Sequence, residues 1–439
     1  MNLKSIENIV SLSKRRGFIF QSSEIYGGLG STWDYGPLGV EMKRKIKNHW
    51  WHEMVTSRDN IVGMDAAILM HPNVWEASGH VSNFHDPMVD CKNCNARYRA
   101  DHVNLDKPCT RCGIKDWTEP RQFNLMFKTS IGPVVDSGEI AYLRPETAQG
   151  IFVNYANVQT TSRQKLPFGI AQLGKAFRNE ITTGNFLFRT REFEQMEMEF
   201  FVHPDDTGKW LEYWSNERLN WFKSLGVSED KLRLRPHGDD ELAHYSSACY
   251  DIEYEFPFGW SELEGIADRG TFDLDQHNEH SGKKQQYFDP QTNSRYVPAV
   301  VEASAGVDRA FLTCLVDAYT EEEVRGEKRT VLKLSPKIAP ITCAVFPLVK
   351  KDGQPEKAQK IVKDIRKEFS AFFDMGGSIG KRYRRQDEAG TPFGITVDHD
   401  TMEDDTVTLR NRDTMEQIRI PAESVVRALR DKIESLTER

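Results

Sequence analysis

The sequence predicts an α+β fold, in which a mostly antiparallel sheet carries a few large helices and a smaller α/β domain follows. Strand-like segments succeed one another as hairpins between residues 167 and 277, and long amphipathic helices separate only some of them. After two prolines near residue 340 the pattern changes, because strand and helix alternate as in a βαβ unit. We therefore expect one domain over residues 1–335 and a second over 336–439.

Two helices are predicted in the first 75 residues. The first spans about residues 3–15. The second has a stronger pattern, since apolar residues recur largely at three- and four-residue spacings from Val40 to Val55. Pro37 and Gly39 stand just ahead, where helix starts tolerate them. Four basic residues occupy the other side, and we interpret them as a solvated helix face: Lys43, Arg44, Lys45 and Lys47.

The remaining elements follow from alternation for strands and from the helical period for helices. The predicted strands are 121–132, 167–181, 189–202, 231–236, 247–258, 259–277, 341–349 and 378–383. The predicted helices are 205–226, 356–373 and 423–436, with a further turn and helix within 143–159. Residues 297–324 read as a strand, a glycine turn and a helix, and residues 391–414 as a hairpin with an acidic middle that faces water.

Composition and charge restrict the class of protein. The chain has 439 residues, of which 38% are hydrophobic, so it can bury more than one core. No apolar run reaches the ~18 residues of a transmembrane helix, and the first residues lack the pattern of a signal peptide. We expect a cytoplasmic protein that does not span a membrane. The net charge of −8 excludes a protein that coats nucleic acid by bulk charge, but it permits a local basic face.

Four of the seven cysteines form two CxxC pairs separated by fourteen residues, in an insertion over residues 90–120. Two thiolates on each of two tight turns suit a tetrahedral site, and Zn²⁺ is the metal that prefers such a site. We predict a structural zinc, because four thiolates leave no open position for catalysis. The alternative is a metal-free knuckle held by packing. The predicted ligands are Cys91, Cys94, Cys109 and Cys112. Ordinary buried thiols are expected for Cys249, Cys314 and Cys343.

The segment 174–200 carries the most chemistry. On a strand alternate residues share a face, so Arg178 and Glu180 point the same way. The return strand is predicted to carry a second set on one face: Arg189, Arg191, Phe193, Gln195, Glu197 and Glu199. Arginine binds phosphate in bidentate fashion and an aromatic ring can stack on a base, so this face could hold a nucleotide. The alternative is an exposed strand face of ion pairs.

A second anion site is predicted where a strand turns into a helix, at Gly306 and Arg309. The sequence contains neither GxxxxGK[ST] nor a GxGxxG that opens a βαβ unit, which excludes a P-loop and a Rossmann site.

These segments resemble a known family. FRNE followed by RTREF resembles motif 2 of class II aminoacyl-tRNA synthetases, GVDR at a helix start resembles motif 3, and GPLGVEMKRKIKNHWW resembles motif 1. Within that class, four segments are similar to the glycyl enzymes of the α2 type: IYGGLGSTWDYGPLG, DAAILMHPNVWEASGH, LRPETAQGIFVNY and REFEQMEMEFF. The resemblance covers nearly the whole chain. It departs mildly in motif 3, where the sequence EASAGVDR stands in place of the commoner EPS-type sequence.

The resemblance implies a class II catalytic domain followed by an anticodon-binding domain, and a homodimer. It also implies that ATP with Mg²⁺ activates glycine to glycyl-adenylate, and that glycine is then transferred to tRNA(Gly). Arg178, Glu180 and Arg309 would be the catalytic residues. The full set implied for ATP is Arg178, Asn179, Glu180, Phe188, Arg189, Thr190, Arg191, Glu192, Phe193, Glu262, Leu263, Gly306, Val307, Asp308 and Arg309.

By the same resemblance, a cage of carboxylates captures the glycine ammonium while filled space excludes a larger side chain. The implied glycine-binding residues are Arg99, Glu146, Phe193, Glu194, Gln195, Met196, Glu197, Glu302, Ala303, Ser304, Ala305 and Gly306. Arg97 is an alternative to Arg99, two residues away. For the anticodon, basic residues around an aromatic ring suit single-stranded bases, which indicates Arg382, Tyr383, Arg384 and Arg385. A solvated basic turn is the alternative there.

Two other functions stay open from sequence alone. One is a class II ligase for another amino acid, such as histidine, threonine or proline, although LRPETAQGIF and EASAG argue against it. The other is a non-catalytic relative that binds tRNA or a partner. Such a protein is expected to lose the arginines of motif 2 or motif 3, and Arg178 and Arg309 are both present.

Overall fold

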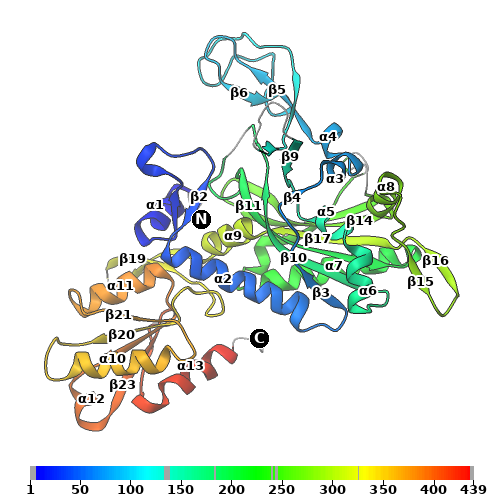
Figure 1. Ribbon diagram of the computed structural model, residues 1–439. Coiled ribbons are helices and arrows are strands. Elements are labelled where there is room, and N and C mark those ends of the chain that lie inside the picture. Colours follow the sequence, from blue (N-terminus) through cyan, green and yellow to red (C-terminus); the bar gives the residue numbers. More distant parts are fainter. Residues whose placement is uncertain are drawn as a thin grey trace.

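The computed structural model describes residues 6–132, 139–181, 184–238, 241–242, 246–324 and 326–435. Its centre is a seven-stranded sheet in the order β12-β13-β14-β17-β11-β10-β3, in which every neighbouring pair is antiparallel except β10 and β3 (Figure 1). The strands are β12 Leu232–Pro236, β13 Ala248–Phe256, β14 Gly259–Gly270, β17 Ala299–Gly306, β11 Glu192–Val202, β10 Phe168–Phe177 and β3 Ile61–Met64. The predicted α+β class is confirmed.

One face of this sheet is apolar and covered by helices. Along β11, Met196, Met198 and Phe200 point to this face and join the largest hydrophobic core. Three helices pack over it: α2 Pro37–Trp51, α7 Thr207–Ser224 and α9 Val307–Ala318. The alternate residues of β11 therefore face the opposite side, which is largely polar.

At one end of the polar face a second, smaller core closes the sheet. It contains Phe152, Tyr155, Phe168 and Phe201. The helices near this end are α5 Ala148–Phe152, α6 Tyr155–Ser162 and α8 Phe272–Ser281. Residues 259–277 were expected to form one strand, but β14 ends at Gly270 and α8 follows. Gly270 has a φ of 56°, which terminates the strand in a conformation that glycine adopts without strain.

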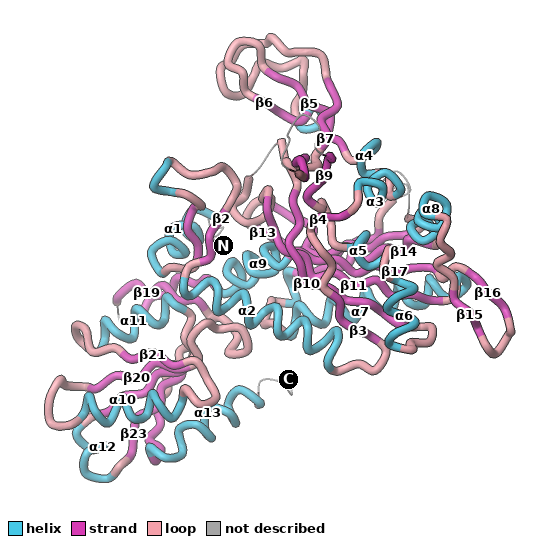
Figure 2. The backbone as a smooth tube through the Cα atoms, in the orientation of Figure 1, coloured by secondary structure: helices cyan, strands magenta, loops and turns pink. Residues whose placement is uncertain are grey.

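The predicted cysteine insertion forms a separate module that projects from the sheet (Figure 2). It consists of β5 His85–Asp90, β6 Arg97–Arg99 and β7 Arg121–Asn124, with the order β6-β5-β7. A second three-stranded sheet connects it to the body through β4 Leu69–Met70, β9 Glu139–Leu143 and β8 Lys128–Ile131. Residues 121–132, expected to be one strand, are thus two strands in different sheets.

The shorter elements complete the larger body. The N-terminal helix α1 is Ile6–Arg16, and residues 3–5 of the predicted helix lie outside the described residues. The other short elements are β1 Ile19–Gln21, β2 Trp33–Tyr35, α3 Pro72–Ala77, α4 His80–Asn83, β15 Tyr287–Asp289, β16 Ser294–Tyr296, β18 Tyr319–Val324 and β19 Glu327–Leu332. Within the described part of the chain, no helix is long and apolar enough to cross a membrane.

The C-terminal part is a five-stranded sheet in the order β21-β20-β22-β23-β24 with its own core. Its strands are β20 Cys343–Pro347, β21 Ala371–Phe373, β22 Phe393–Val397, β23 Thr406–Asn411 and β24 Gln417–Pro421. Its helices are α10 Gln354–Ile365, α11 Ile379–Ala389, α12 His399–Asp404 and α13 Val425–Glu434. The predicted boundary after residue 335 stays a prediction, and Ile338 and Ala339 still pack in the core of the larger body.

Three predicted elements of this part differ from the structure. The helix predicted over 356–373 is α10, which ends at Ile365, and residues 371–373 form strand β21. Residues 378–383 begin helix α11, and the second parallel strand is β21 instead. The helix was missed because the side chains it buries are mostly polar, namely Arg382, Gln386 and Asp387. The predicted hairpin of residues 391–414 pairs as expected, but helix α12 lies between its strands. The last helix is α13, and residue 436 of the prediction lies outside the described residues.

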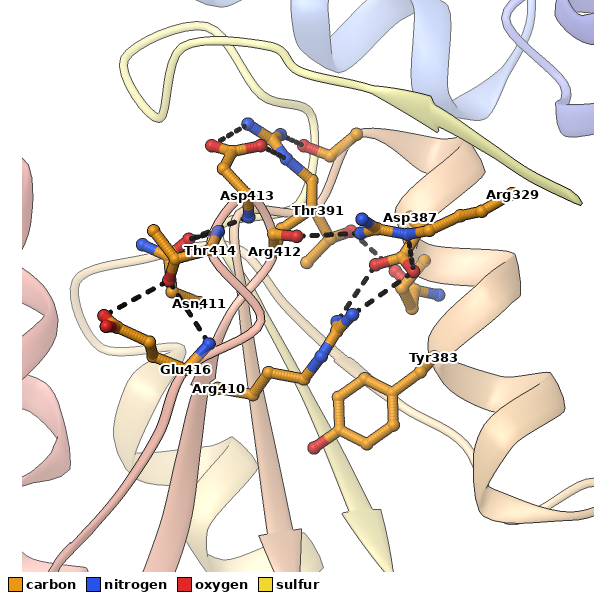
Figure 3. A network of polar contacts seen from close by, with 12 residues as sticks. Arg329, Tyr383, Asp387, Thr391, Arg410, Asn411, Arg412, Asp413, Thr414 and Glu416 are labelled. Carbon is orange, nitrogen blue, oxygen red and sulfur yellow. Dashed lines mark hydrogen bonds and ion pairs between the residues drawn. The ribbon is translucent and has the colours of Figure 1, made fainter. Parts of the chain in front are cut away.

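A buried network joins the hairpin β18–β19 to the C-terminal sheet (Figure 3). The fully buried Arg329 on β19 donates from Nε to Asp387 Oδ2 at 2.9 Å and from Nη2 to the carbonyl of Arg412 at 2.7 Å. Arg410 donates to the other oxygen of Asp387 at 3.0 Å. Two segments distant in sequence are therefore locked through one carboxylate.

We expect the substitution Arg329→Leu to destabilise the protein, because it leaves Asp387 buried with half of its cationic partners. The loss in free energy of unfolding should be about 3 kcal/mol, measured by urea unfolding followed by circular dichroism. The matched control is Arg427→Leu, which removes an exposed arginine whose pair with Asp431 is open to solvent. Equal losses for the two variants would show that the network contributes no more than a surface ion pair.

Candidate active site

The polar face of the central sheet contains a cavity of about 320 Å³. Its walls come from the loop that joins β10 to β11, from β13, β14 and β17, and from the first turn of α9. One end carries arginines and the other end carries glutamates. The predicted site residues that line it are Glu146, Arg178, Glu180, Phe188, Arg189, Thr190, Phe193, Gln195, Glu197, Glu262, Leu263, Glu302, Ser304, Ala305, Gly306, Asp308 and Arg309.

At the arginine end, Arg178 is held between a backbone oxygen and two rings. Its Nε donates to the carbonyl of Pro145 at 3.0 Å. Its guanidinium carbon lies 5.4 Å from the centre of the Phe193 ring and 5.3 Å from that of Phe84. These contacts fix the side chain and leave its remaining donors free to bind an anion. Glu180 and Arg189 lie beside it, 3.8 Å apart.

Arg309 enters the cavity from the first turn of α9. Its Nε donates to the carbonyl of Phe188 at 3.1 Å, and its guanidinium lies over the Phe188 ring at 4.4 Å. Its Nη1 lies 3.4 Å from a carboxylate oxygen of Glu262. The Arg309 charge, acting against burial, lowers the pKa of Glu262, which is therefore ionised at neutral pH.

At the other end, Glu146, Glu197 and Glu302 converge with Ser304. Thr147 donates a short hydrogen bond to Glu197, and Gln195 donates to Ser304 Oγ at 3.3 Å. Burial raises the pKa of Glu197 to about 8, and the neighbouring carboxylates of Glu302 and Glu146 add to the shift. Burial also raises the pKa of Glu302. This end has more acidic groups than counter-charges, as expected of a site that takes a cation.

Arg269 supplies the main counter-charge and was not predicted from the sequence. It lies on β14, is 2% exposed, and donates to Glu302 at 2.6 Å and to both oxygens of Asp273. Burial tends to raise the pKa of Glu146, but His80, Arg269 and Arg178 together lower it well below its usual range. The only signal for Arg269 in the sequence is an arginine at the end of a strand, which is common.

Gln149, His237, Cys249 and Asp251 were also missed. Gln149 Nε2 donates to Glu146 at 3.1 Å, and the others line the cavity from β13 and the segment before it. Cys249, predicted as an ordinary buried thiol, is only partly buried and faces the cavity. Burial raises its pKa to about 12, so the thiol is neutral. The predicted burial of Cys314 and Cys343 is confirmed.

Of the predicted solvated face of the second helix only Arg44 is exposed, since the Lys45 amine donates to the carbonyl of Ala339 at 2.6 Å and Lys47 pairs with Glu194. The prediction fails most clearly for Lys43. It is 9% exposed, and its Nζ contacts Asp308 Oδ1 at 2.9 Å and Glu194 at 3.1 Å. Asp308 also accepts from the hydroxyl of Tyr35 and from the backbone N–H of Glu194. Burial opposes ionisation of Asp308, but Lys43 and the hydrogen bonds lower its pKa. Asp308 therefore borders the cavity, but its carboxylate oxygens already accept hydrogen bonds from Tyr35, Lys43 and Glu194.

Four residues predicted for ATP do not line the cavity. The strand β11 starts only at Glu192, so the predicted alternation fails for the residues before it. Arg191 instead donates to the carbonyl of Gly30 at 2.8 Å, and Glu192 pairs with Lys175 outside. The backbone N–H of Asn179 bonds the carbonyl of Leu125. Val307 lies in the hydrophobic core.

Four residues predicted for glycine also lie elsewhere. Glu194, Met196 and Ala303 occupy the alternate positions of their strands and face the helices, Glu194 toward Lys43 and Lys47. Arg99 is in the module, where it pairs with Asp86 at 2.8 Å and Asp101 at 2.7 Å. Arg97, the alternative, is more exposed and pairs with Asp90. The described structure brings neither arginine to the cavity wall.

Comparison with known proteins agrees with this geometry. Residues 127–319 match the family described as the tRNA synthetase class II core domain (G, H, P, S and T). The glycine–tRNA ligase of Treponema denticola is 56% identical over 441 residues, 98% of each chain, and that of Borreliella burgdorferi is 57% identical over 94% of each chain. This chain belongs to the glycine–tRNA ligase family. The glycine–tRNA ligase of Caldanaerobacter subterraneus is 53% identical over 98% of each chain.

The C-terminal part of this glycine–tRNA ligase family member matches a second family. Residues 342–432 match the family described as the anticodon binding domain. A solved structure of prolyl-tRNA synthetase from Cryptosporidium parvum superposes with a TM-score of 0.69 over 98% of this chain and 77% of that chain. At 14% identity this likeness shows the fold alone.

The four predicted metal ligands of this family member lie together. The sulfur atoms of Cys91, Cys94, Cys109 and Cys112 all lie within 4.8 Å of one another. Two of the separations are 3.6 Å and 3.8 Å. A tetrahedron of sulfurs around Zn²⁺ with bonds of ~2.3 Å has edges of ~3.8 Å, so the thiols fit this metal. The separations are too long for a disulfide.

The four residues predicted to bind the anticodon do not form one exposed patch. Arg382 is 2% exposed and donates to the carbonyl of Pro347 at 2.6 Å. Tyr383 lies against β22, where a Cβ on Gly394 would come within 2.5 Å of its ring, and its hydroxyl bonds Thr396. The burial of Arg382 argues against direct phosphate contact, and Tyr383 is only partly exposed. The partly exposed members are Arg384 and Arg385, which pair with Glu327 and Asp374.

Proposed function

We propose that this chain is a ligase that activates glycine with ATP and transfers it to the 3′ end of tRNA(Gly). The observation that carries the proposal is the polarity of the cavity, with arginines at one end and buried carboxylates at the other. An amino acid bound with its ammonium among the glutamates directs its carboxylate toward Arg178. Membership of the glycine–tRNA ligase family supports glycine as the substrate.

In the first step, a carboxylate oxygen of glycine attacks the α-phosphorus of ATP, a phosphorus–oxygen bond breaks, and pyrophosphate leaves. Arg178 would bind the α-phosphate and the glycine carboxylate, and Arg309 the γ-phosphate. Phe193 would stack on adenine, and Glu180 and Arg189 would complete the nucleotide contacts. Such catalysis depends on positioning and charge stabilisation, so no protein nucleophile is needed.

Mg²⁺ bound with ATP neutralises phosphate charge, and Glu262 offers a carboxylate oxygen of the kind this ion prefers. In the second step, a hydroxyl of the terminal adenosine of tRNA attacks the carbonyl carbon of the adenylate and AMP leaves. Since tRNA is used in the cytoplasm, we expect the enzyme there.

Glycine specificity would follow from the crowded carboxylate end. Glu146, Glu197, Glu302 and Ser304 surround the space for the ammonium. An added methyl group meets a filled wall there, and overpacking of a rigid wall is unfavourable. The wall should therefore discriminate against a larger amino acid by more binding free energy than a pocket gains from contact with one additional methyl group.

The test is ATP–pyrophosphate exchange with glycine, and with alanine, serine, histidine, threonine and proline in parallel. We expect exchange with glycine alone, and a loss of about 100-fold in Arg178→Ala because a preorganised charge is removed from the transition state. The matched control is Arg191→Ala in the same segment, whose side chain lies outside the cavity and which should retain most of the exchange. Charging of tRNA(Gly) with labelled glycine checks the second step.

Exchange with another amino acid would overturn the assignment of the carboxylate end. The absence of exchange with every amino acid, in folded protein, would instead favour the non-catalytic alternative. Equal losses for Arg178→Ala and Arg191→Ala would contradict the proposed placement of the α-phosphate.

We also propose that the cysteine module holds one structural zinc ion. Its support is the spacing of the four thiols and the separations of their sulfur atoms. We expect about one zinc per chain by elemental analysis, and a loss of this zinc in Cys109→Ser. Cys343→Ala, a buried thiol of the other domain, should keep it. Zinc-free protein with an intact module would contradict this proposal.

Finally, we infer a homodimer. Support comes from an exposed apolar loop between β1 and β2, in which Ile25, Tyr26 and Leu29 are 89%, 87% and 58% exposed. Large contiguous apolar groups at a surface are typical of an interface. Light scattering should give twice the chain mass of 50.4 kDa, and Tyr26→Asp should shift the mass toward the single chain. A wild-type protein that remains at the single-chain mass would contradict the homodimer.

A further inference from the structure

A buried acidic residue, Glu199, stands beside the cavity and has no role in the proposed reaction. Glu199 lies on β11, two residues after Glu197 and on the same face. It is fully buried, and neither of its carboxylate oxygens accepts a hydrogen bond from a described donor. The register places it between Ile170 on β10 and Glu302 on β17. A buried carboxyl group with no partner is costly unless it is neutral.

Glu199 belongs to a cluster of three buried glutamates. One carboxylate oxygen of each of Glu197, Glu199 and Glu302 lies within 4.8 Å of the others. Glu199 and Glu302 are directly opposite each other on antiparallel strands, where two like charges are destabilising. Carboxylates that share a site in this way cannot all be ionised.

The charged groups that face Glu199 come from four elements. Glu302 lies on β17, Arg269 on β14, Asp273 on α8, and Glu197 on β11 itself. Arg269 is already shared between Glu302 and Asp273. On the β10 side the neighbour is the apolar Ile170.

The electrostatics agree with this geometry. Burial raises the pKa of Glu199 well above its usual range, and the charge of Glu302 raises it further, while Arg269 only partly opposes the shift. The pKa of Glu197 is raised less, to about 8. With this pKa Glu197 is also mostly protonated at pH 7 and ionises in weakly alkaline solution, whereas Glu199 keeps its proton there.

We propose that Glu199 is a positioning residue which stays protonated throughout the reaction and supports Glu197 and Glu302 from behind as a neutral hydrogen-bond donor. The glycine ammonium is then the cation that balances the carboxylates at the cavity wall. An ionised Glu199 would add a further negative charge that an inorganic cation could neutralise, in competition with glycine. This inference rests on the proposed glycine-activating function.

The first test compares the wild type with Glu199→Gln, which keeps the size and neutrality of the protonated acid. We expect a KM for glycine within about 3-fold of the wild type, because one neutral donor replaces another. In the wild type this KM should rise as pH falls from 8.5 to 6.5, since Glu197 gains a proton below its pKa of about 8. The profile of Glu199→Gln should superimpose on it.

A shift of that profile to lower pH would overturn the proposal. Loss of a negative charge beside Glu197 and Glu302 lowers their pKa values, so a shift would show that Glu199 is ionised in the wild type. A large increase in KM for Glu199→Gln would overturn it as well, because an amide cannot replace a carboxylate that binds a cation.

The second test is Glu199→Met, which keeps the volume but removes the donor. We expect KM for glycine to rise about 10-fold or more, with a smaller change in kcat at saturating glycine. An unchanged KM would show that Glu199 only fills space, and would overturn the positioning role. If Glu199→Met does not fold, the pH profile of Glu199→Gln still decides the question.

Failure of this inference differs from failure of the proposed function. If wild-type protein shows no glycine-dependent exchange, the function itself is wrong. If the wild type exchanges normally and only the profile of Glu199→Gln departs from expectation, the function stands and the protonation of Glu199 is wrong.

Discussion

The carboxylate of Asp308 is the contact on which the arrangement of the catalytic body depends. It accepts from Tyr35, from Lys43 on α2 and from the backbone of Glu194 on β11, while it belongs itself to the first turn of α9. One buried anion therefore fixes a strand, two helices and the central sheet relative to one another. Because Arg309 follows directly in the chain, its place in the cavity depends on the same contact.

The central sheet separates an apolar, helix-covered side from a polar cavity, and a single strand contributes side chains to both sides. On β11 the apolar residues face the helices and the acidic residues face the cavity, with strict alternation from Gln195 to Phe200. A shift of one residue in register would exchange the two faces. The apolar face thus holds the carboxylates in place, although it makes no contact with any substrate. The buried acidic groups on the other face are tolerated because Arg269 and protonation reduce the excess of negative charge there.

Much of this organisation could be predicted from the sequence. The antiparallel sheet, the strand-to-helix turn at Gly306 and the cysteine cluster follow from local periodicity and spacing, and the structure agrees with them. Within the cavity, Arg178, Arg309 and the glutamates were found because their segments resemble a family. Local patterns could not place Arg269 or Lys43 at the site, because Glu302 lies 33 residues from Arg269 and Asp308 lies 265 residues from Lys43 in the chain.

The errors have physical causes of the same kind. The sequence predicts a strand at the start of helix α11 because few apolar residues recur there at helical spacing. The side chains that this helix buries are mostly polar, namely Arg382, Gln386 and Asp387. The expectation that Arg382 and Tyr383 bind RNA assumes that basic and aromatic residues are exposed, whereas Arg382 is buried and Tyr383 packs against β22 with only part of its side chain exposed. Charge in a sequence does not reveal which side chains reach solvent.

The contacts of Arg329 also bear on how modular the two domains are. Asp387 and Arg410 belong to the segment that matches the anticodon binding domain family, whereas Arg329 precedes that segment. A C-terminal domain transplanted from another synthetase would carry its own residues to this junction. If an aliphatic residue replaced Asp387, Arg329 would remain buried and would lose its main anionic partner. Domain exchange between such enzymes is therefore constrained by one matched pair of charges, even where the two folds agree closely.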